Sequence, residues 1–93
     1  MLIGGFNTKT GEPELYWVDY LGAMVRLPFG AQGYGAYFCT SLMDRYHHAD
    51  MDLEQGKQLL RQCIQELKTR FIVNLPRFMV KVITKDGIQE IEL

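Results

Sequence analysis

The residues best suited to chemistry lie between Gly30 and His48, in the stretch GAQGYGAYFCTSLMDRYHH. Its three clustered glycines, Gly30, Gly33 and Gly35, follow the order G-x-x-G-x-G, which reverses the dinucleotide-binding fingerprint. No Gly-Lys-Ser/Thr follows them, so the phosphate-loop pattern fails as well. Small residues here instead allow the first turn of a helix to approach a neighbouring backbone closely. We therefore predict no nucleotide and no other cofactor in this stretch.

The adjacent histidines His47 and His48 have the side chains of metal ligands but not the spacing. Neighbouring residues on a helix point about 100° apart, so both imidazoles cannot face one metal ion. Asp44 and Asp50 lie nearby, but a zinc-type H-x-x-x-H spacing is absent. We predict a helix end or an interhelical loop here, and no metal site.

The chain contains two cysteines, Cys39 and Cys63, and both fall within apolar helical patterns. A nucleophilic Cys39 would need a base and an orienting group, and no basic residue neighbours it in the sequence. Buried reduced thiols are the expected state, and a disulfide between two helices is the alternative. No other residues form a catalytic constellation, so we predict no catalytic site.

Size and composition predict one globular domain. The chain has 93 residues, of which 47% are hydrophobic and 23% are charged. Its formal net charge of -1 gives no electrostatic reason to expect nucleic acid or an anionic membrane as a partner. No apolar run approaches the roughly 20 residues that a membrane-spanning helix needs.

Two apolar runs near the start, Leu2–Asn7 and Glu14–Asp19, predict a β-hairpin whose turn carries Asn, Gly and Pro. Alternate residues of the second run are apolar on both faces, so we expect both faces of this strand to be covered. The stretch Ala23–Ala31 stays open between a third strand and a loop, because Pro28 cannot donate a hydrogen bond to a sheet.

Two helices follow. The first runs from Gly33 through His47 and is apolar nearly all round, which predicts that it is buried. The second begins at Asp52, where Gln55 three residues later completes a capping box, and ends at Asn74-Leu75-Pro76. Gly56 in its first turns suggests close packing there. The predicted apolar stripe of this helix consists of Leu60, Cys63, Ile64, Leu67 and Phe71.

A second hairpin closes the sequence. Phe78–Thr84 alternates between two faces, Asp86-Gly87 is a two-residue turn signal, and Ile88–Leu93 returns as the partner strand. The predicted class is α+β, in the order of a β-hairpin, the open third strand, two helices and a C-terminal β-hairpin.

Several segments in this order resemble the proteasome β-subunit family. The segments are GEPELYWVDYLG, GYGAYFCTSLMDRY and the run from MDLEQGKQLL to TKDGI. The resemblance is to the non-catalytic type-2 members at the β4 ring position, whose patterns appear here as Asp44-Arg45-Tyr46, Arg70-Phe71-Ile72, Asn74-Leu75-Pro76 and Phe78. It implies that residues 1–93 form a single partial domain, the C-terminal half of an Ntn-hydrolase αββα sandwich, with the N-terminal half absent.

The resemblance also implies that the chain is not an enzyme. Catalytic members carry G-S-G-S where this chain has Gly33-Tyr34-Gly35-Ala36, and the second serine falls on Ala36. They also carry D-x-x-S-G-G after the second helix, where Phe71 takes the place of the aspartate and Asn74 that of the serine. Neither alanine nor phenylalanine forms a side-chain hydrogen bond.

The implied role is that of a structural subunit of the 20S proteasome core, which supports ubiquitin- and proteasome-dependent protein breakdown by assembly into the β ring. The implied partners are other proteasome α and β subunits, in the cytoplasm and nucleus. We predict subunit contacts at Arg45, Tyr46, His47 and His48, because an aromatic ring, a guanidinium and imidazoles at a helix end suit interfaces. Sheet edges and apolar faces left open by half a sandwich favour a protein neighbour or aggregation.

Two alternatives remain open. One is a threonine-type Ntn hydrolase subunit, which needs a processed N-terminal Thr, Ser or Cys, whereas this sequence starts Met-Leu. The other is a free-standing α/β interaction module.

Overall fold

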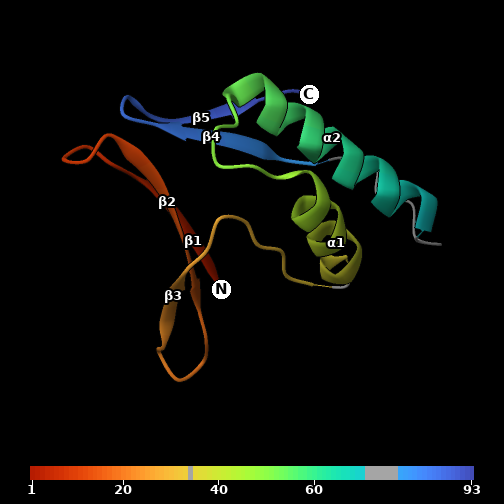
Figure 1. Ribbon diagram of the computed structural model, residues 1–93, viewed down its shortest axis with the longest axis horizontal. Coiled ribbons are helices and arrows are strands. Elements are labelled where there is room, and N and C mark those ends of the chain that lie inside the picture. The colour runs from red at the N-terminus through yellow and green to blue at the C-terminus, as the bar shows by residue number, and fades with distance from the viewer. Residues whose placement is uncertain (34, 71–77) are drawn as a thin grey trace. The chain divides into compact units, whose positions relative to one another are not determined.

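The computed structural model describes residues 1–33, 35–70 and 78–93. Within these ranges the chain forms two helices and two small sheets (Figure 1). The elements in chain order are β1 Leu2–Asn7, β2 Glu12–Val18, β3 Met24–Arg26, α1 Ala36–Tyr46, α2 Leu53–Arg70, β4 Val80–Thr84 and β5 Gly87–Ile91. This order and the α+β class are confirmed, and both agree with part of an Ntn-type fold.

The chain divides into two compact units, which are described separately. The first consists of Met1–Gly30 and Met79–Glu92 and holds both sheets. The second consists of Ala31–Phe78 with Leu93 and holds both helices.

The turn between β1 and β2 is built around Asn7. Its side-chain Oδ1 accepts hydrogen bonds from the backbone N–H groups of Lys9 at 2.9 Å and Thr10 at 3.3 Å. The N–H of Gly11 donates to the Asn7 carbonyl at 2.8 Å. Gly11 has φ +74°, a backbone conformation that glycine adopts at little cost. The predicted hairpin turn is therefore confirmed, with Asn and Gly in the roles that their chemistry favours.

β2 begins before the predicted Glu14 and includes Pro13. Met1 and Val18 exchange two backbone hydrogen bonds, at 3.0 and 2.9 Å. Hydrogen-bonded and non-hydrogen-bonded pairs alternate along an antiparallel ladder, so the Phe6–Pro13 pair is non-hydrogen-bonded. The Pro13 nitrogen therefore faces away from β1, on the side where β3 pairs only from Tyr16 onward. A proline is tolerated there because no sheet partner needs its missing N–H.

The stretch Ala23–Ala31, which the sequence left undecided between a strand and a loop, contains a short edge strand. β3 pairs antiparallel with β2 over three residues, Met24–Arg26. The N–H of Leu27 still donates to the Leu15 carbonyl at 2.8 Å, and the strand has ended before Pro28. The proline limits the strand as expected, without preventing it.

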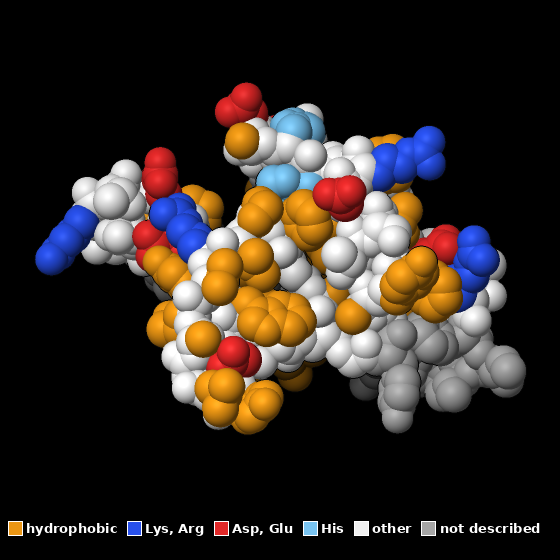
Figure 2. All heavy atoms as spheres, turned by 60° about the horizontal axis from the view of Figure 1, so that its bottom comes forward, with side chains coloured by type: hydrophobic (Ala, Val, Ile, Leu, Met, Phe, Trp, Pro, Cys, Tyr) orange, Lys and Arg blue, Asp and Glu red, His pale blue; other side chains and the backbone are white. Residues whose placement is uncertain are grey.

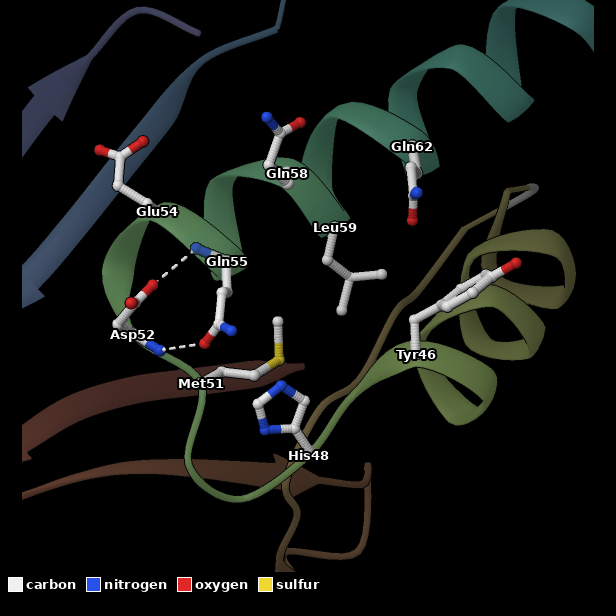
Figure 3. Close-up of a pocket in the computed structure, with 9 residues that line it drawn as sticks. All are labelled: Tyr46, His48, Met51, Asp52, Glu54, Gln55, Gln58, Leu59 and Gln62. Atoms are coloured by element: carbon white, nitrogen blue, oxygen red, sulfur yellow. Dashed lines mark hydrogen bonds between the residues drawn. The ribbon is translucent and has the colours of Figure 1, made fainter.

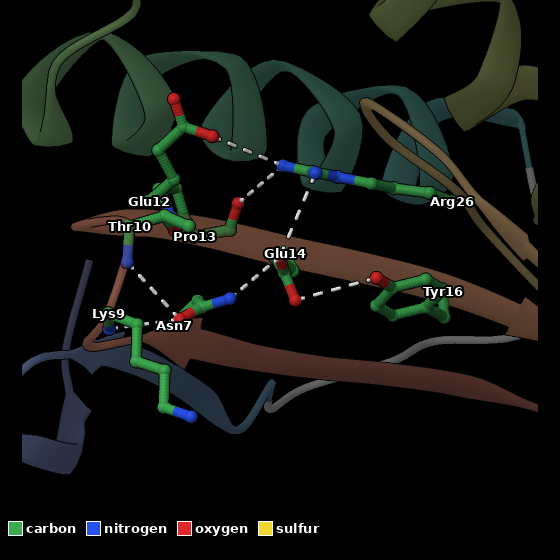
Figure 4. A network of polar contacts seen from close by, with 8 residues as sticks. All are labelled: Asn7, Lys9, Thr10, Glu12, Pro13, Glu14, Tyr16 and Arg26. Carbon is green, nitrogen blue, oxygen red and sulfur yellow. Dashed lines mark hydrogen bonds and ion pairs between the residues drawn. The ribbon is translucent and has the colours of Figure 1, made fainter.

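Arg26 of β3 joins a polar network over the exposed side of the hairpin (Figure 4). Its guanidinium lies 3.6 Å from the Glu12 carboxylate and 3.7 Å from that of Glu14, and it donates to the Pro13 carbonyl at 3.4 Å. Tyr16 adds a long hydrogen bond of 3.5 Å to Glu14. Because Arg26 and Glu12 are largely solvated and both ion pairs are 3.6 Å or longer, each pair contributes about 0–1 kcal/mol.

The expectation that both faces of β2 are covered is wrong. None of its residues is buried, and Trp17 keeps 36% of its surface exposed. Packing between the sheets of this unit is thin, with the Ile83 side chain of β4 lying over Gly4 of β1. In the space-filling view of Figure 2, hydrophobic side chains (orange) accordingly reach the surface. The buried hydrophobic residues within the described ranges are Cys39, Leu59 and Cys63, all on helices.

The C-terminal hairpin forms, but its turn lies one residue earlier than predicted. Thr84 pairs with Gly87, so the turn residues are Lys85 and Asp86. Type I′ turns require positive φ at both central positions, and no described non-glycine residue has positive φ. Gly87 supplies the left-handed conformation just after the turn, at φ +118°. The Asp-Gly signal thus marks the hairpin correctly, with the glycine in the first paired position.

In the second unit, α1 is shorter and more exposed than predicted. It runs from Ala36 to Tyr46, and Cys39 is its one buried residue. Tyr37 keeps 79% of its surface exposed, so the expectation of a buried helix is wrong. An apolar circumference predicts burial only where neighbours cover every side, and in this unit α1 packs against α2.

α2 begins as predicted, but the face that it buries differs from the predicted apolar stripe. The Asp52 N–H donates to Gln55 Oε1 at 3.0 Å, and the Gln55 N–H donates to Asp52 Oδ1 at 2.8 Å, which confirms the capping box. Leu59 is buried at 8% exposure whereas Leu60 is exposed at 36%, so the predicted stripe is wrong at that position. The close packing expected at Gly56 is wrong too, because no described atom beyond its own stretch of helix lies within 4 Å of a Cβ placed there. Phe71 and the predicted end at residues 74–76 lie outside the described residues.

Candidate functional site

A groove of about 370 Å³ lies where the end of α1, the interhelical loop and the first turns of α2 meet (Figure 3). It belongs entirely to the second unit. Its lining residues are Tyr46, His48, Met51, Asp52, Glu54, Gln55, Gln58, Leu59 and Gln62.

The α2 wall follows from helical spacing. Gln55, Leu59 and Gln62 are separated by three or four residues, so they share one side of the helix. The capping box fixes the first turn of this wall through Asp52. Glu54 at the rim is held by an ion pair of 3.3 Å with Lys57. The wall is therefore a row of amides beside one buried leucine.

The α1 wall consists of the helix end and the loop that follows it. The Arg45 guanidinium carbon lies 5.3 Å from the centre of the Tyr46 ring, within the range of a cation–π contact. His47 leaves the helix with an extended backbone, and its N–H donates to the Met43 carbonyl at 2.8 Å. The His48 carbonyl accepts a bond of 3.3 Å from the Met51 N–H, which closes the loop toward α2.

The structure brings two of the four predicted contact residues into this groove. Tyr46 and His48 line it, and Arg45 adjoins it through the Tyr46 ring. His47 is half-buried and is not among the lining residues. The role of all four in subunit contacts stays a prediction.

Sequence reasoning missed the residues that α2 contributes to the groove. A usable signal was present: Gln55, Gln58 and Gln62 recur at spacings of three and four on the helix that follows the two histidines. A polar row at helical spacing is usually a solvated face, and the loop geometry turns this one into a wall.

The chemistry of the groove suits a protein contact better than a reaction. It combines amides, an imidazole, a phenol, the Asp52 and Glu54 carboxylates and apolar side chains, and its lining includes no serine, threonine, cysteine or lysine that could act as a nucleophile. Within residues 1–33, 35–70 and 78–93, no three His, Cys, Asp or Glu side chains gather to hold a metal ion. Interface cores are enriched in tyrosine and methionine, and this groove contains both.

The position at which the family resemblance places a supporting serine of catalytic members is held by Ala36, the first residue of α1. Gly35 precedes it as the N-cap and forms no side-chain capping bond. This end of the helix therefore offers no side-chain polar group at either residue. The family resemblance also concerned three residues that lie outside the described ranges: Tyr34, Phe71 and Asn74.

The two cysteines form a second cluster. Cys39 of α1 and Cys63 of α2 are free, buried thiols on two helices that pack against each other. Burial raises the pKa of Cys39, the neighbouring Cys63 thiol opposes that rise and the Glu66 carboxylate adds to it. Burial, helped by Cys39, raises the pKa of Cys63 to about 11. The prediction of buried reduced thiols is confirmed.

Among the helices of the described part of the chain, none combines the length and the hydropathy that crossing a bilayer requires.

Comparison with known proteins identifies relatives along nearly the whole chain. A family model described as "Proteasome subunit" matches residues 1–83. A probable proteasome subunit beta type-4 from Meyerozyma guilliermondii is 44% identical over 92 residues, which cover 99% of this chain and 47% of the relative. The proteasome subunit beta type-4 from Saccharomyces cerevisiae is also 44% identical, over 99% of this chain and 46% of its own length. Proteasome subunit beta type-2-B from Arabidopsis thaliana is 37% identical over 97% of this chain and 45% of its own length. The chain thus spans about half the length of the curated relatives it matches.

Proposed function

Because the chain belongs to the proteasome subunit family, we propose that it acts as a structural, non-catalytic β-type subunit of the 20S core particle. Its task in this proposal is to fill the β4 place of the β ring and so support proteasome-dependent protein breakdown in the cytoplasm and nucleus. The relatives carry both type-4 and type-2 names, so the type-2 assignment rests on the sequence patterns. The observation that carries the proposal is the family match over residues 1–83.

The non-catalytic part of the proposal is supported by Ala36. The family resemblance places a supporting serine of catalytic members at this residue, and a methyl group there donates and accepts no hydrogen bond. The threonines near the start, Thr8 and Thr10, belong to the turn of the first hairpin. The Thr10 N–H is fixed by Asn7, as a turn residue would be.

A covalent threonine-directed probe tests this part. We expect no labelling of the chain when it is incubated with the probe, alone or with the core particle, while catalytic subunits in the same sample react. Mass spectrometry of the chain after incubation gives the readout. A covalent adduct on any threonine of this chain would instead favour the hydrolase alternative.

The partner part of the proposal assigns the groove to a neighbouring α or β subunit. Tyr46 keeps 45% of its surface exposed beside an apolar floor that includes Leu59. A partly exposed aromatic ring next to a preformed hollow is the usual geometry of an interface anchor. Arg45, stacked on this ring, adds a cation that a partner carboxylate can approach.

Co-sedimentation with the assembled core particle tests the assignment. We expect Tyr46→Ala and His48→Ala to reduce the fraction of chain that migrates with the particle by several-fold. The matched control is Tyr37→Ala, which removes an exposed tyrosine of the same helix that does not line the groove. Equal losses in the control and the groove variants would refute the assignment. Wild-type chain that migrates as a stable monomer beside intact particles would favour the free-standing module.

A further inference from the structure

We propose that Cys39 and Cys63 form an oxidisable pair, a modification site at which exchange with a small-molecule disulfide such as oxidised glutathione links α1 to α2. Both thiols are free in the structure. The sequence contains two cysteines, so an intramolecular disulfide has a single pairing. The inference stands independently of the proposed function.

The geometry carries this inference. Cys39 lies on α1 and Cys63 on α2, and these helices pack against each other. Cys39 is the buried residue of α1, and Cys63 is one of the two buried residues of α2, so both thiols lie in the contact between these helices. Each thiol also perturbs the pKa of the other, as expected for neighbouring groups. A disulfide requires a short approach between the two backbones, and helix packing places both cysteines where such an approach occurs.

Exposure assigns different roles to the two sulfurs. Cys39 is the more exposed of the two, at 9% against 4%. Burial raises the pKa of both thiols, that of Cys63 to about 11. The nearby charged groups are the Glu66 carboxylate and Arg70, which are paired at 2.7 Å. Cys39 is thus the attacking residue and Cys63 the resolving one.

The exchange proceeds in two balanced steps. Cys39 loses its proton and attacks one sulfur of oxidised glutathione; the glutathione S–S bond breaks and one glutathione leaves as a thiolate, which takes up a proton. Cys63 then loses its proton and attacks the Cys39 sulfur, which displaces the second glutathione. Two electrons and two protons pass from the cysteine pair to the reagent, giving one protein disulfide and two glutathione thiols.

Burial makes the reaction slow without making it unfavourable. A reagent reaches the pair when the helices separate locally. Raised pKa values reduce the thiolate fraction at neutral pH, so the rate should rise with pH. The equilibrium position depends instead on how well the native structure accommodates the bond.

Equilibration of the full chain in glutathione redox buffers tests the proposal. We expect the native monomer to lose both free thiols and the mass of two hydrogen atoms, without added glutathione. The equilibrium constant for disulfide formation should be roughly 100-fold larger in native buffer than in urea, because a bond that fits the fold is favoured by it. A ratio of one or less, or products that are glutathione adducts or linked dimers, would overturn the proposal.

Single-cysteine variants test the assigned order. Cys63→Ser leaves Cys39 as the single thiol, and Cys39→Ser leaves Cys63, so each variant can form only a mixed disulfide. We expect faster adduct formation in Cys63→Ser, because Cys39 is the more exposed thiol. The reverse order would contradict the roles given to the two sulfurs. Circular dichroism checks the folding of both variants. The redox-buffer comparison of native and urea-unfolded wild-type chain tests disulfide formation even if neither variant folds.

Discussion

At the scale of single residues, the Cys63 thiol links folding stability to alkaline pH. Its pKa is raised to about 11 by burial, whereas the unfolded chain releases the proton near the ordinary value of 9.0. Between these values the folded state holds more protons, so stability must fall as pH rises from about 9 to about 11. Cys39 shifts in the same direction and adds to the effect.

We therefore expect the free energy of unfolding to drop by about 1–3 kcal/mol across this range because of Cys63. Urea unfolding curves under reducing conditions at several pH values measure the drop. The control is Cys63→Ser, in which tyrosine and lysine still titrate but this thiol does not. Parallel curves for the two proteins would show that the thiol is not buried in the folded chain.

At the scale of elements, the two neighbouring leucines of α2 separate the packed face from the solvated one. We expect Leu59→Ala to cost about 2–4 kcal/mol of stability, because it deletes a buried side chain at 8% exposure. Leu60→Ala, on the exposed side, should cost less than about 1 kcal/mol. Urea unfolding of the two variants compares them directly. Equal costs would mean that the helix is rotated from the described position.

The sequence was sufficient for most elements because their signals are local. The hairpin turn at Asn7 and the cap at Asp52 depend on contacts within four residues, and both are confirmed. The Asp-Gly signal marked a hairpin but not which residue would pair first, since that depends on the conformation of Gly87.

Burial and the groove were harder to predict because they depend on neighbours rather than on pattern. The apolar circumference of α1 indicated a covered helix, yet Tyr37 is largely solvated. Likewise, Leu59 and Leu60 are equally apolar, and only the position of α1 selects the one that packs. In the groove, the helix end at Tyr46 and His48 was anticipated. The glutamine wall was not, because it becomes a wall only when the loop folds back.

At the scale of the whole molecule, the apolar surface predicts self-association. Around β3, the large exposed hydrophobic residues are Tyr20, Leu21, Met24 and Val25. Edge strands with uncovered apolar residues pair readily with other chains. We expect the isolated chain to form oligomers at micromolar concentration, as measured by sedimentation velocity.

Val25→Lys should shift the chain toward monomer, because a charged side chain on an edge strand opposes intermolecular pairing. Thr8→Lys adds the same charge at the hairpin turn, away from β3, and serves as the control. A wild-type chain that stays monodisperse, or an equal effect of both lysines, would show that β3 does not drive association.

Pro13 in β2 limits where a strand of another chain can add to this sheet. Along the margin of β2 that β3 leaves unoccupied, one backbone donor is missing at Pro13, and the Arg26 guanidinium already occupies the carbonyl of that residue. An incoming strand would find a broken template there, with a vacant amide position and a bulky cation in its path. Fibril-like stacking of many copies through this margin is therefore disfavoured, even though the neighbouring surface around β3 is apolar and exposed.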